Sequence, residues 1–294
     1  MQRLNWNDLR YLLAVERGGT LSGAARLIGA DETTVSRRLK VLRELTGDEL
    51  YWRQRDGTLI LTDIGSQVAR HAAQMEAQVD HVSELLGRDQ QQLSGTVRLT
   101  SVPWLINRCL ANQVGTLLQQ YPALTLELNP DSRDLDLNLR EADIALRLSR
   151  PRAGGTETLA RRIGELPFGV YASRSSSSKA EDTLPWIGYD EMTSHLPQAQ
   201  WIAKMARQPG QRLAGLKVMD VETALEAAIA GVGRTLLPIP IAQATRSLTS
   251  LSGDGPVLSR EIWLLTHRSQ NEWRRTKVVV SWIEDLMHLL LGDR

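Results

Sequence analysis

Apolar residues in the first 62 positions recur at helical spacing and are separated by glycines. This pattern predicts helices over 6–16 and 21–28, each closed by a glycine that can end a helix. A third helix is predicted over 32–46, with Asp31 as its N-cap. The segment LYWRQRDGTLILT predicts two short strands joined at Asp56-Gly57, because Asp-Gly is a strong hairpin signal. Three helices followed by a hairpin are typical of a winged helix-turn-helix.

A longer helix is predicted from Asp63 onward, because its apolar residues lie three and four positions apart. This spacing forms a heptad seam, and a solitary helix would leave that seam without a partner. We therefore predict a dimerisation helix over 63–89; the alternative is that the seam packs on the chain's own first domain. The seam residues are Ile64, Val68, Ala72, Met75, Val79, Val82 and Leu86.

The polar segment DQQQLSG at 89–95 predicts a hinge. After it, predicted strands and helices alternate, which favours parallel sheets with helices on both faces. The length of this part, about 200 residues, predicts two subdomains. The predicted strands are 96–101, 125–128, 143–148, 159–173, 235–238 and 261–267, and the predicted helices are 104–119, 221–231 and 272–291.

Composition limits where the chain acts and what attracts it. The net charge is +1, so any attraction to nucleic acid must be local. Cys109 is the only cysteine, which excludes an internal disulfide, and its helical spacing within an apolar stretch predicts a packed core residue instead of a thiol sensor. MQRLNWNDLR lacks the apolar centre of a signal peptide, and no apolar run approaches the roughly 20 residues that span a bilayer. We expect a cytoplasmic protein without a membrane partner.

Motifs for catalysis, metals and cofactors are missing from the sequence. It contains no GxSxG, GxGxxG, P-loop or HExxH pattern. The five histidines show no metal-ligand spacing with cysteine or acidic residues. We therefore expect neither an enzyme nor a bound cofactor.

The stretch AARLIGADETTVSRRLK carries the residues that a helix-turn-helix requires. Ala25 permits close approach of two helices, Gly29 can adopt a left-handed conformation in the turn, and Val35 supplies an apolar contact beneath the second helix. In an isolated helix, the basic residues that follow would most simply form a solvated face. The preceding helix and the hairpin favour DNA binding.

If helix 32–46 enters the major groove, its N-terminal residues face the base edges. Arg37 can pair with guanine O6 and N7, a contact worth roughly 1–3 kcal/mol of discrimination. Ser36 and Arg38 can bind phosphates, and the two arginines near the hairpin can add backbone or minor-groove contacts. The candidate DNA-binding residues are Glu32, Thr33, Thr34, Ser36, Arg37, Arg38, Lys40, Arg53 and Arg55.

The segments DLRYLLAV, AARLI, TTVSRRLKVLRE and LTDIG together resemble the N-terminal domain of LysR-type transcriptional regulators. ADIALRL, VYAS and AGVGRTLLP extend the resemblance, more loosely, over nearly the whole chain. It implies a homodimer through the linker helix, commonly assembled into a homotetramer, and a C-terminal α/β effector domain of two lobes resembling type II periplasmic binding proteins. The implied domains are 1–62 for DNA binding, 63–89 for dimerisation and 90–294 for effector binding, with lobe I at about 95–164 and 267–294 and lobe II at about 165–266.

The chain departs from the family pattern at Glu32, where such regulators usually have Gln, and at Thr33. Glutamine can both donate to and accept from adenine, whereas a carboxylate only accepts. Glu32 can accept from cytosine N4, or it can cap its own helix. Both readings of Glu32 stay open on the sequence.

The resemblance places the effector between the two lobes, near strand ends and helix N-termini. Thr100 and Ser101 precede a predicted helix, where hydroxyls and free N–H groups suit a carboxylate or another small anion. Arg147 could neutralise such an anion or form a structural ion pair. The candidate effector-binding residues are Thr100, Ser101, Asn129, Arg147, Asp220 and Thr223.

The resulting expectation is a regulator that binds double-stranded DNA and responds to a small-molecule effector. RNA polymerase is a further partner to consider for such a regulator. The alternative is a solute-binding or enzymatic C-terminal domain with an appended DNA-binding module.

Overall fold

In a computed structural model, the chain forms two compact units, residues 1–91 and 92–294. Among the residues that the structure describes, no helix is both long and apolar enough to cross a membrane. The described residues are 4–85, 93–131, 142–151, 158–176, 183–253, 255–271 and 273–292.

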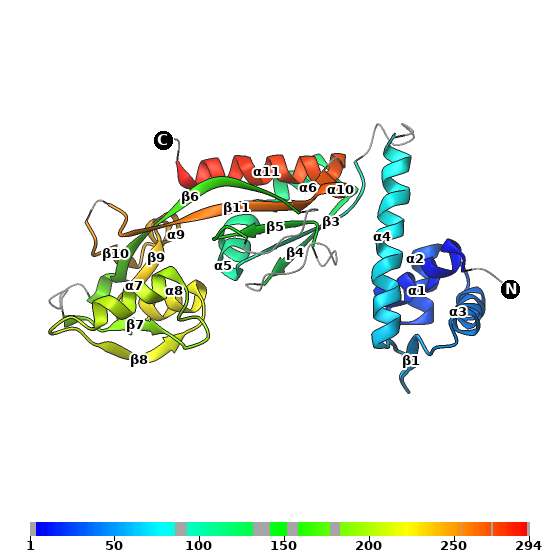
Figure 1. The fold of residues 1–294 in the computed structure, drawn as a ribbon, viewed down its shortest axis with the longest axis horizontal. Coiled ribbons are helices and arrows are strands. Elements are labelled where there is room, and N and C mark those ends of the chain that lie inside the picture. The colour runs from blue at the N-terminus through cyan, green and yellow to red at the C-terminus, as the bar shows by residue number, and fades with distance from the viewer. Residues whose placement is uncertain are drawn as a thin grey trace. The chain divides into compact units, whose positions relative to one another are not determined.

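The first unit contains the three helices and the hairpin that the sequence predicts (Figure 1). Thr20 and Asp31 are the N-caps of the second and third helices, since their side chains accept hydrogen bonds from the N–H groups of Gly23 and Thr34. Gly29 ends the second helix at a φ of 72°, a conformation that strains residues with a Cβ. The elements are α1 (Trp6–Gly18), α2 (Leu21–Ile28), α3 (Glu32–Thr46), β1 (Tyr51–Arg53) and β2 (Leu59–Leu61).

Helix α4 (Asp63–Leu85) packs its first half against the rest of the first unit. Ala69 and Ala72 are fully buried in the core that α1 and α3 also form. At Gly65 a Cβ would lie 1.8 Å from the carbonyl oxygen of Leu50, so only glycine allows the helix to approach the start of the hairpin this closely. The buried residues of α4 correct the predicted seam at Ala72, because this side chain is covered by its own domain.

The second unit is built on a mixed sheet whose strand order is β10-β6-β11-β5-β3-β4, with β9 also paired to β6. The predicted parallel pairing is confirmed for β3 with β4 and β5. It is wrong for β6, β9, β10 and β11, which pair with antiparallel neighbours. The strands are β3 (Gly95–Ser101), β4 (Leu124–Pro130), β5 (Ile144–Arg147), β6 (Thr158–Ser173), β9 (Thr235–Pro238), β10 (Leu248–Ser250) and β11 (Leu258–His267).

Strands β6 and β11 run from lobe I, which holds β3 to β5, into lobe II (Figure 1). Lobe II contains a second, parallel pair of strands that the sequence did not predict. Trp263–Thr266 pair with β5 and so belong to lobe I, which corrects the lobe II limits of 165–266. The further elements of lobe II are β7 (Trp186–Tyr189), α7 (Pro197–Ala206), β8 (Leu213–Val218), α8 (Val221–Ile229) and α9 (Ile239–Ala244).

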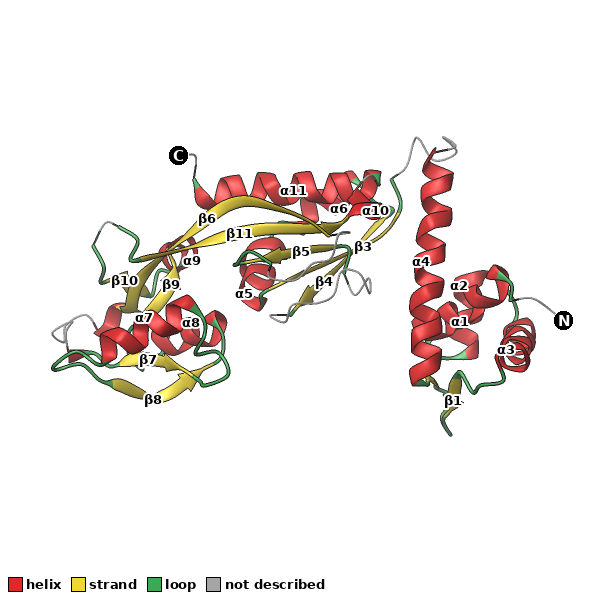
Figure 2. Ribbon diagram, in the orientation of Figure 1, coloured by secondary structure: helices red, strands yellow, loops and turns green. Residues whose placement is uncertain are grey.

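Helices of lobe I differ from prediction in one place. The single helix predicted over 104–119 is wrong, because the N–H of Ala111 donates to the carbonyl of Ile106 and widens the chain into a π-helical turn. The final helix is confirmed, and it lies along β6 and β11 (Figure 2). These elements are α5 (Pro103–Leu105), η1 (Ile106–Leu110), α6 (Val114–Gln120), α10 (Arg268–Asn271) and α11 (Arg274–Leu291), while η3 (Arg174–Ser176) follows β6.

Candidate nucleic-acid interface and effector site

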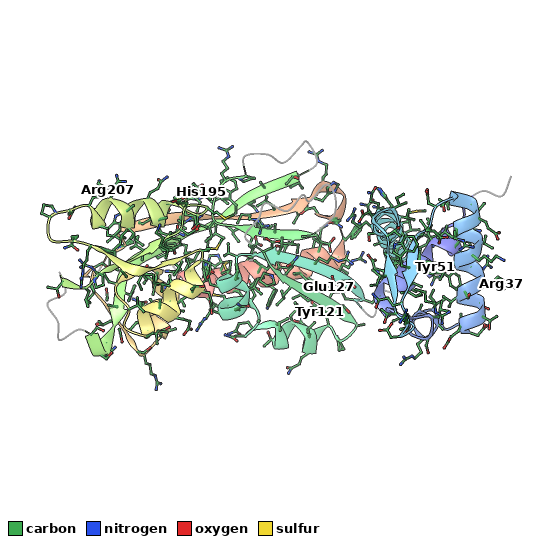
Figure 3. The ribbon with its side chains drawn as sticks, turned by 90° about the horizontal axis from the view of Figure 1, so that it is seen from below. Arg37, Tyr51, Tyr121, Glu127, His195 and Arg207 are labelled. Carbon is green, nitrogen blue, oxygen red and sulfur yellow. The ribbon has the colours of Figure 1, made fainter. Side chains whose placement is uncertain are left out.

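Helix α3 has a buried face and an exposed face, and the exposed face carries most of the predicted DNA-binding residues. Val35 and Leu39 are buried in the core of the first unit. Arg37 lies on the side of α3 that faces away from the rest of the unit (Figure 3), and it forms no ion pair with any residue that the structure describes. Its guanidinium is therefore available to a partner. The exposed candidates on α3 are Glu32, Thr33, Ser36, Arg37 and Lys40.

The start of α3 is capped by Asp31 and not by Glu32. Oδ1 of Asp31 accepts from the N–H of Thr34 at 2.8 Å, and Oδ2 accepts from the Thr34 hydroxyl at 2.8 Å. These hydrogen bonds lower the pKa of the Asp31 carboxyl. Since Asp31 fills the cap and engages Thr34, Glu32 remains an exposed carboxylate in the first turn.

The remaining basic residues of α3 already have acidic partners. Arg38 Nη1 lies 3.0 Å from Oδ1 of Asp8, a buried carboxylate of α1. This ion pair holds α3 against α1, which gives Arg38 a structural contact in addition to its predicted one. Lys40 Nζ lies 3.9 Å from Oε1 of Glu44, and both side chains are well exposed. Such surface pairs contribute little and leave Lys40 able to exchange partners.

The hairpin presents the two predicted wing arginines to solvent. Arg53 ends β1 and Arg55 lies in the turn; both are exposed, and neither pairs with an acidic residue in the described ranges. The turn is fixed by Asp56, whose Oδ1 accepts from the N–H of Thr58 at 2.9 Å. Two cations without an acidic partner among the described residues thus lie on the hairpin, one at the end of β1 and one in its turn.

An apolar stripe runs along the surface of α4. We call Ile64, Met75, Val79 and Val82 the exposed stripe, because their side chains are between 43% and 52% exposed. Val68 is half-buried against the core of the unit, and Leu86 lies outside the described residues. Large apolar side chains aligned on one helix face are typical of an interaction surface.

The carboxyl end of β3 brings two predicted effector residues into the interior. Thr100 and Ser101 are both fully buried, and the Ser101 hydroxyl donates to the carbonyl of Leu146 at 3.1 Å. Within the described part of the chain, the Thr100 hydroxyl has no hydrogen-bond partner. Asn129, on β4, pairs in register with Thr100 of β3 and is exposed. The predicted helix start beside them is confirmed, since α5 begins at Pro103 and continues into η1.

Three other predicted effector residues have structural contacts. Arg147 is buried, and its Nη1 donates to the carbonyl of Leu146 at 3.1 Å. Asp220 caps α8: Oδ1 accepts from the N–H of Thr223 at 2.8 Å and Oδ2 from its hydroxyl at 3.0 Å. Asp220 and Thr223 therefore bond each other, and their role in effector binding stays a prediction.

Sequence reasoning missed a polar cluster where the two lobes meet. We call Tyr189, Gln198 and Arg260 the junction cluster. Arg260 Nε donates to the carbonyl of Leu148 at 3.2 Å, and its Nη1 donates to Oε1 of Gln198 at 3.1 Å. Burial lowers the pKa of Arg260 to about 10, and burial also raises the pKa of Tyr189, which lies close enough to feel Asp220 and Arg260. No motif marks these residues, since three separate segments supply them.

A second polar contact across the lobes was also missed. Arg108 of η1 contacts two carboxylates of α8: its Nη2 lies 2.6 Å from Oε1 of Glu222 and 2.5 Å from Oε1 of Glu226. These acceptors raise the pKa of Arg108. The adjacent Cys109 is packed against the core, and burial followed by the charge of Glu222 raises its pKa to about 12. The thiol is therefore protonated at neutral pH.

Family models match almost the whole chain. Residues 6–66 match the bacterial regulatory helix-turn-helix protein, lysR family, and residues 90–287 match the LysR substrate binding domain. The chain belongs to the LysR family of transcriptional regulators. The predicted fold class is confirmed: a winged helix-turn-helix with a linker helix, followed by a two-lobed α/β effector domain.

This LysR-type regulator is similar to proteins of known name over its full length. It is 29% identical over 299 residues to the Mau operon transcriptional activator of Paracoccus denitrificans, covering 99% of each chain. A full-length OxyR variant from Pseudomonas aeruginosa has a TM-score of 0.68 at 16% identity, covering 98% of this chain and 96% of the other. CrgA from Neisseria meningitidis has a TM-score of 0.54 at 21% identity, covering 99% and 100%. The two structures establish the shared fold.

Proposed function

We propose that this LysR-type regulator binds DNA through α3 in the major groove, as a dimer, and that a small carboxylate effector between the lobes of its C-terminal domain sets its activity. The observation that carries the DNA-binding part is the exposed face of α3. It presents Arg37 without an acidic partner among the described residues, beside exposed Ser36. A free guanidinium on a recognition helix can donate both bonds to one guanine.

The contacts divide into base reading and positioning. We assign base reading to Arg37, Thr33 and Glu32, where Glu32 accepts from cytosine N4 because Asp31 already caps the helix. We assign phosphate contacts to Ser36 and Lys40 on α3 and to the two wing arginines. Thr34 and Arg38 hold α3 in place for these contacts, since Thr34 donates to Asp31 and Arg38 donates to Asp8.

The exposed stripe on α4 supports dimerisation. A second copy of α4 would cover Met75, Val79 and Val82 and remove them from water. Two α3 helices related by twofold symmetry would read two half-sites about 10–10.5 base pairs apart, or a multiple of that spacing. A regulator assembled in this way can also contact RNA polymerase from its DNA-bound position.

Selection of DNA from a random pool by the purified full-length protein tests this proposal. We expect enrichment of an inverted repeat that contains a guanine in each half-site. Enrichment of no sequence at physiological salt, with the protein folded and oligomeric, would contradict sequence-specific binding. Enrichment of a single half-site without its repeat would contradict the dimeric arrangement.

A further inference from the structure

Arg260 differs from Arg98 and Arg108 of the effector domain in the chemistry of its partners. Arg98 pairs with Glu127, and Arg108 pairs with two glutamates. Arg260 instead donates to two neutral oxygens, a backbone carbonyl and the amide of Gln198. No carboxylate in the described ranges forms an ion pair with it. A largely buried cation with only neutral partners has an uncompensated charge, and a bound anion would stabilise it.

The guanidinium of Arg260 lies where elements of both lobes meet. Its Nε bonds Leu148, the residue that follows β5 in lobe I, and its Nη1 bonds Gln198 on α7 in lobe II. Ser101, at the end of β3, bonds the carbonyl two residues before Leu148. In open α/β sheets, ligands bind beyond the carboxyl ends of the strands.

The first turn of α7 adds further donors beside Arg260. The N-cap is Leu196, which provides no side-chain cap, and Pro197 is the first residue of this helix of 10 residues. The next N–H groups, beginning with that of Gln198, have no acceptor within the helix. The contrast with α8 is direct, because Asp220 fills the corresponding position there. The positive end of α7 therefore lacks a side-chain cap, and an anion there would be stabilised.

The guanidinium itself retains donors for a ligand. Arginine has five N–H groups, and its described hydrogen bonds use two of them. Tyr189, at the end of β7, adds a phenol whose raised pKa keeps it protonated and able to donate. A planar carboxylate matches a guanidinium with two parallel bonds. A neutral ligand would leave the cation uncompensated.

We propose that Arg260, with Gln198 and Tyr189, forms the subsite that binds the carboxylate of the effector and that this subsite links the two lobes. The inference rests on the proposed function, and it names the junction cluster in place of Arg147, Asp220 or Thr223. A carboxylate bound here contacts β11 and α7 at once. Its binding therefore fixes the position of lobe II against the end of β5.

The test uses the full-length protein and three carboxylates, propanoate, benzoate and succinate, with their neutral amides as paired probes. We expect at least one carboxylate to raise the Tm of the wild-type protein and its amide to have no effect. Arg260→Gln should weaken that carboxylate by roughly tenfold or more, since it removes a charge-assisted bidentate pair. Arg207→Gln is the matched control, because Arg207 is exposed at the end of α7 and has the same charge change (Figure 3). It should keep the full response.

A second variant covers the case in which Arg260→Gln does not fold. Gln198→Glu places a carboxylate beside the guanidinium, so the protein supplies its own anion. We expect this variant to lose the carboxylate response while its Tm without ligand does not fall.

The inference is overturned by a full response in Arg260→Gln, by an equal response to carboxylate and amide, or by a response lost in Arg147→Gln but kept in Arg260→Gln. Absence of any response in the wild type also overturns it. Sequence-specific DNA binding by the wild-type protein, measured in parallel, tests the proposed DNA-binding function separately.

Discussion

The exposed face of α3 and the junction cluster of the effector domain use arginine in opposite ways. Arg37 projects into solvent from a helix whose other face is buried. Arg260 lies among neutral acceptors, and burial lowers its pKa to about 10. The first arrangement suits a large polyanion that docks from outside and is screened by salt. The second suits one small anion, because low polarity strengthens each contact with it. Exposure therefore separates the two kinds of recognition.

The largest effect is expected from substitutions in the exposed stripe of α4. They should prevent the first unit from forming a dimer that presents two α3 helices to DNA. Met75→Glu with Val79→Glu places charges where a second helix should pack. With four apolar side chains lost per dimer, association should weaken by on the order of 5 kcal/mol or more. Sedimentation should then show monomers.

The matched control for the stripe is Arg70→Glu. It makes the same change of two charges at another exposed position of α4. We expect it to remain a dimer. If the stripe variant sediments like the wild type, α4 is not the interface.

A pair of glycine substitutions separates the stability of the two units. Gly65→Ala should destabilise the first unit by roughly 1–3 kcal/mol, because its Cβ would meet the carbonyl oxygen of Leu50. Gly115→Ala in α6 has open space around it and should stabilise by about 0.5–1 kcal/mol. Chemical denaturation followed by circular dichroism measures both. Equal changes of the same sign would contradict the close packing at Gly65.

The buried thiol of Cys109 predicts a pH dependence confined to the second unit. Its pKa rises from 9.0 to about 12 on folding. The contribution of the protonated thiol to the free energy of unfolding is therefore complete below pH 9 and is lost as the pH rises towards 12. At pH 10 the loss should be roughly 1 kcal/mol. Cys109→Ala should flatten this alkaline slope. An unchanged slope in that variant would show that the thiol ionises equally in both states.

The smallest effect is expected from the ion pairs of Arg108. Removing Arg108 or Glu222 should cost about 0.5–1 kcal/mol, because the pairs are partly exposed to solvent. A double-mutant cycle with both changed to Ala isolates the coupling energy. We expect coupling that shrinks at 1 M salt. A coupling energy of zero at low salt would mean that these residues do not hold the lobes together.

Local signals explain why the first unit could be predicted closely. Thr20, Asp31 and Asp56 each bond a backbone N–H within three residues, so their roles follow from spacing alone. The heptad spacing likewise identified the exposed stripe. It could not show that Ala72 turns into the core, because that depends on how α4 lies against α1.

The effector domain depends on contacts between distant segments, which limits prediction from sequence. Arg260 meets Gln198 across 62 positions and Leu148 across 112. The apolar pattern of β6 and β11 revealed strands but not their antiparallel pairing, since the direction of pairing is set between segments far apart in the chain. Asp220 and Thr223 had the right chemistry for an effector, yet their three-residue spacing is that of a helix cap.

Fluorescence anisotropy with the selected repeat measures whether α3 reads DNA through Arg37. Arg37→Ala should weaken binding by roughly 1–3 kcal/mol per half-site and abolish the preference for guanine at one position. Arg10→Ala, which removes an exposed arginine of α1, should bind like the wild type. If Arg37→Ala keeps its affinity and its guanine preference at physiological salt, the assignment of the recognition helix is wrong.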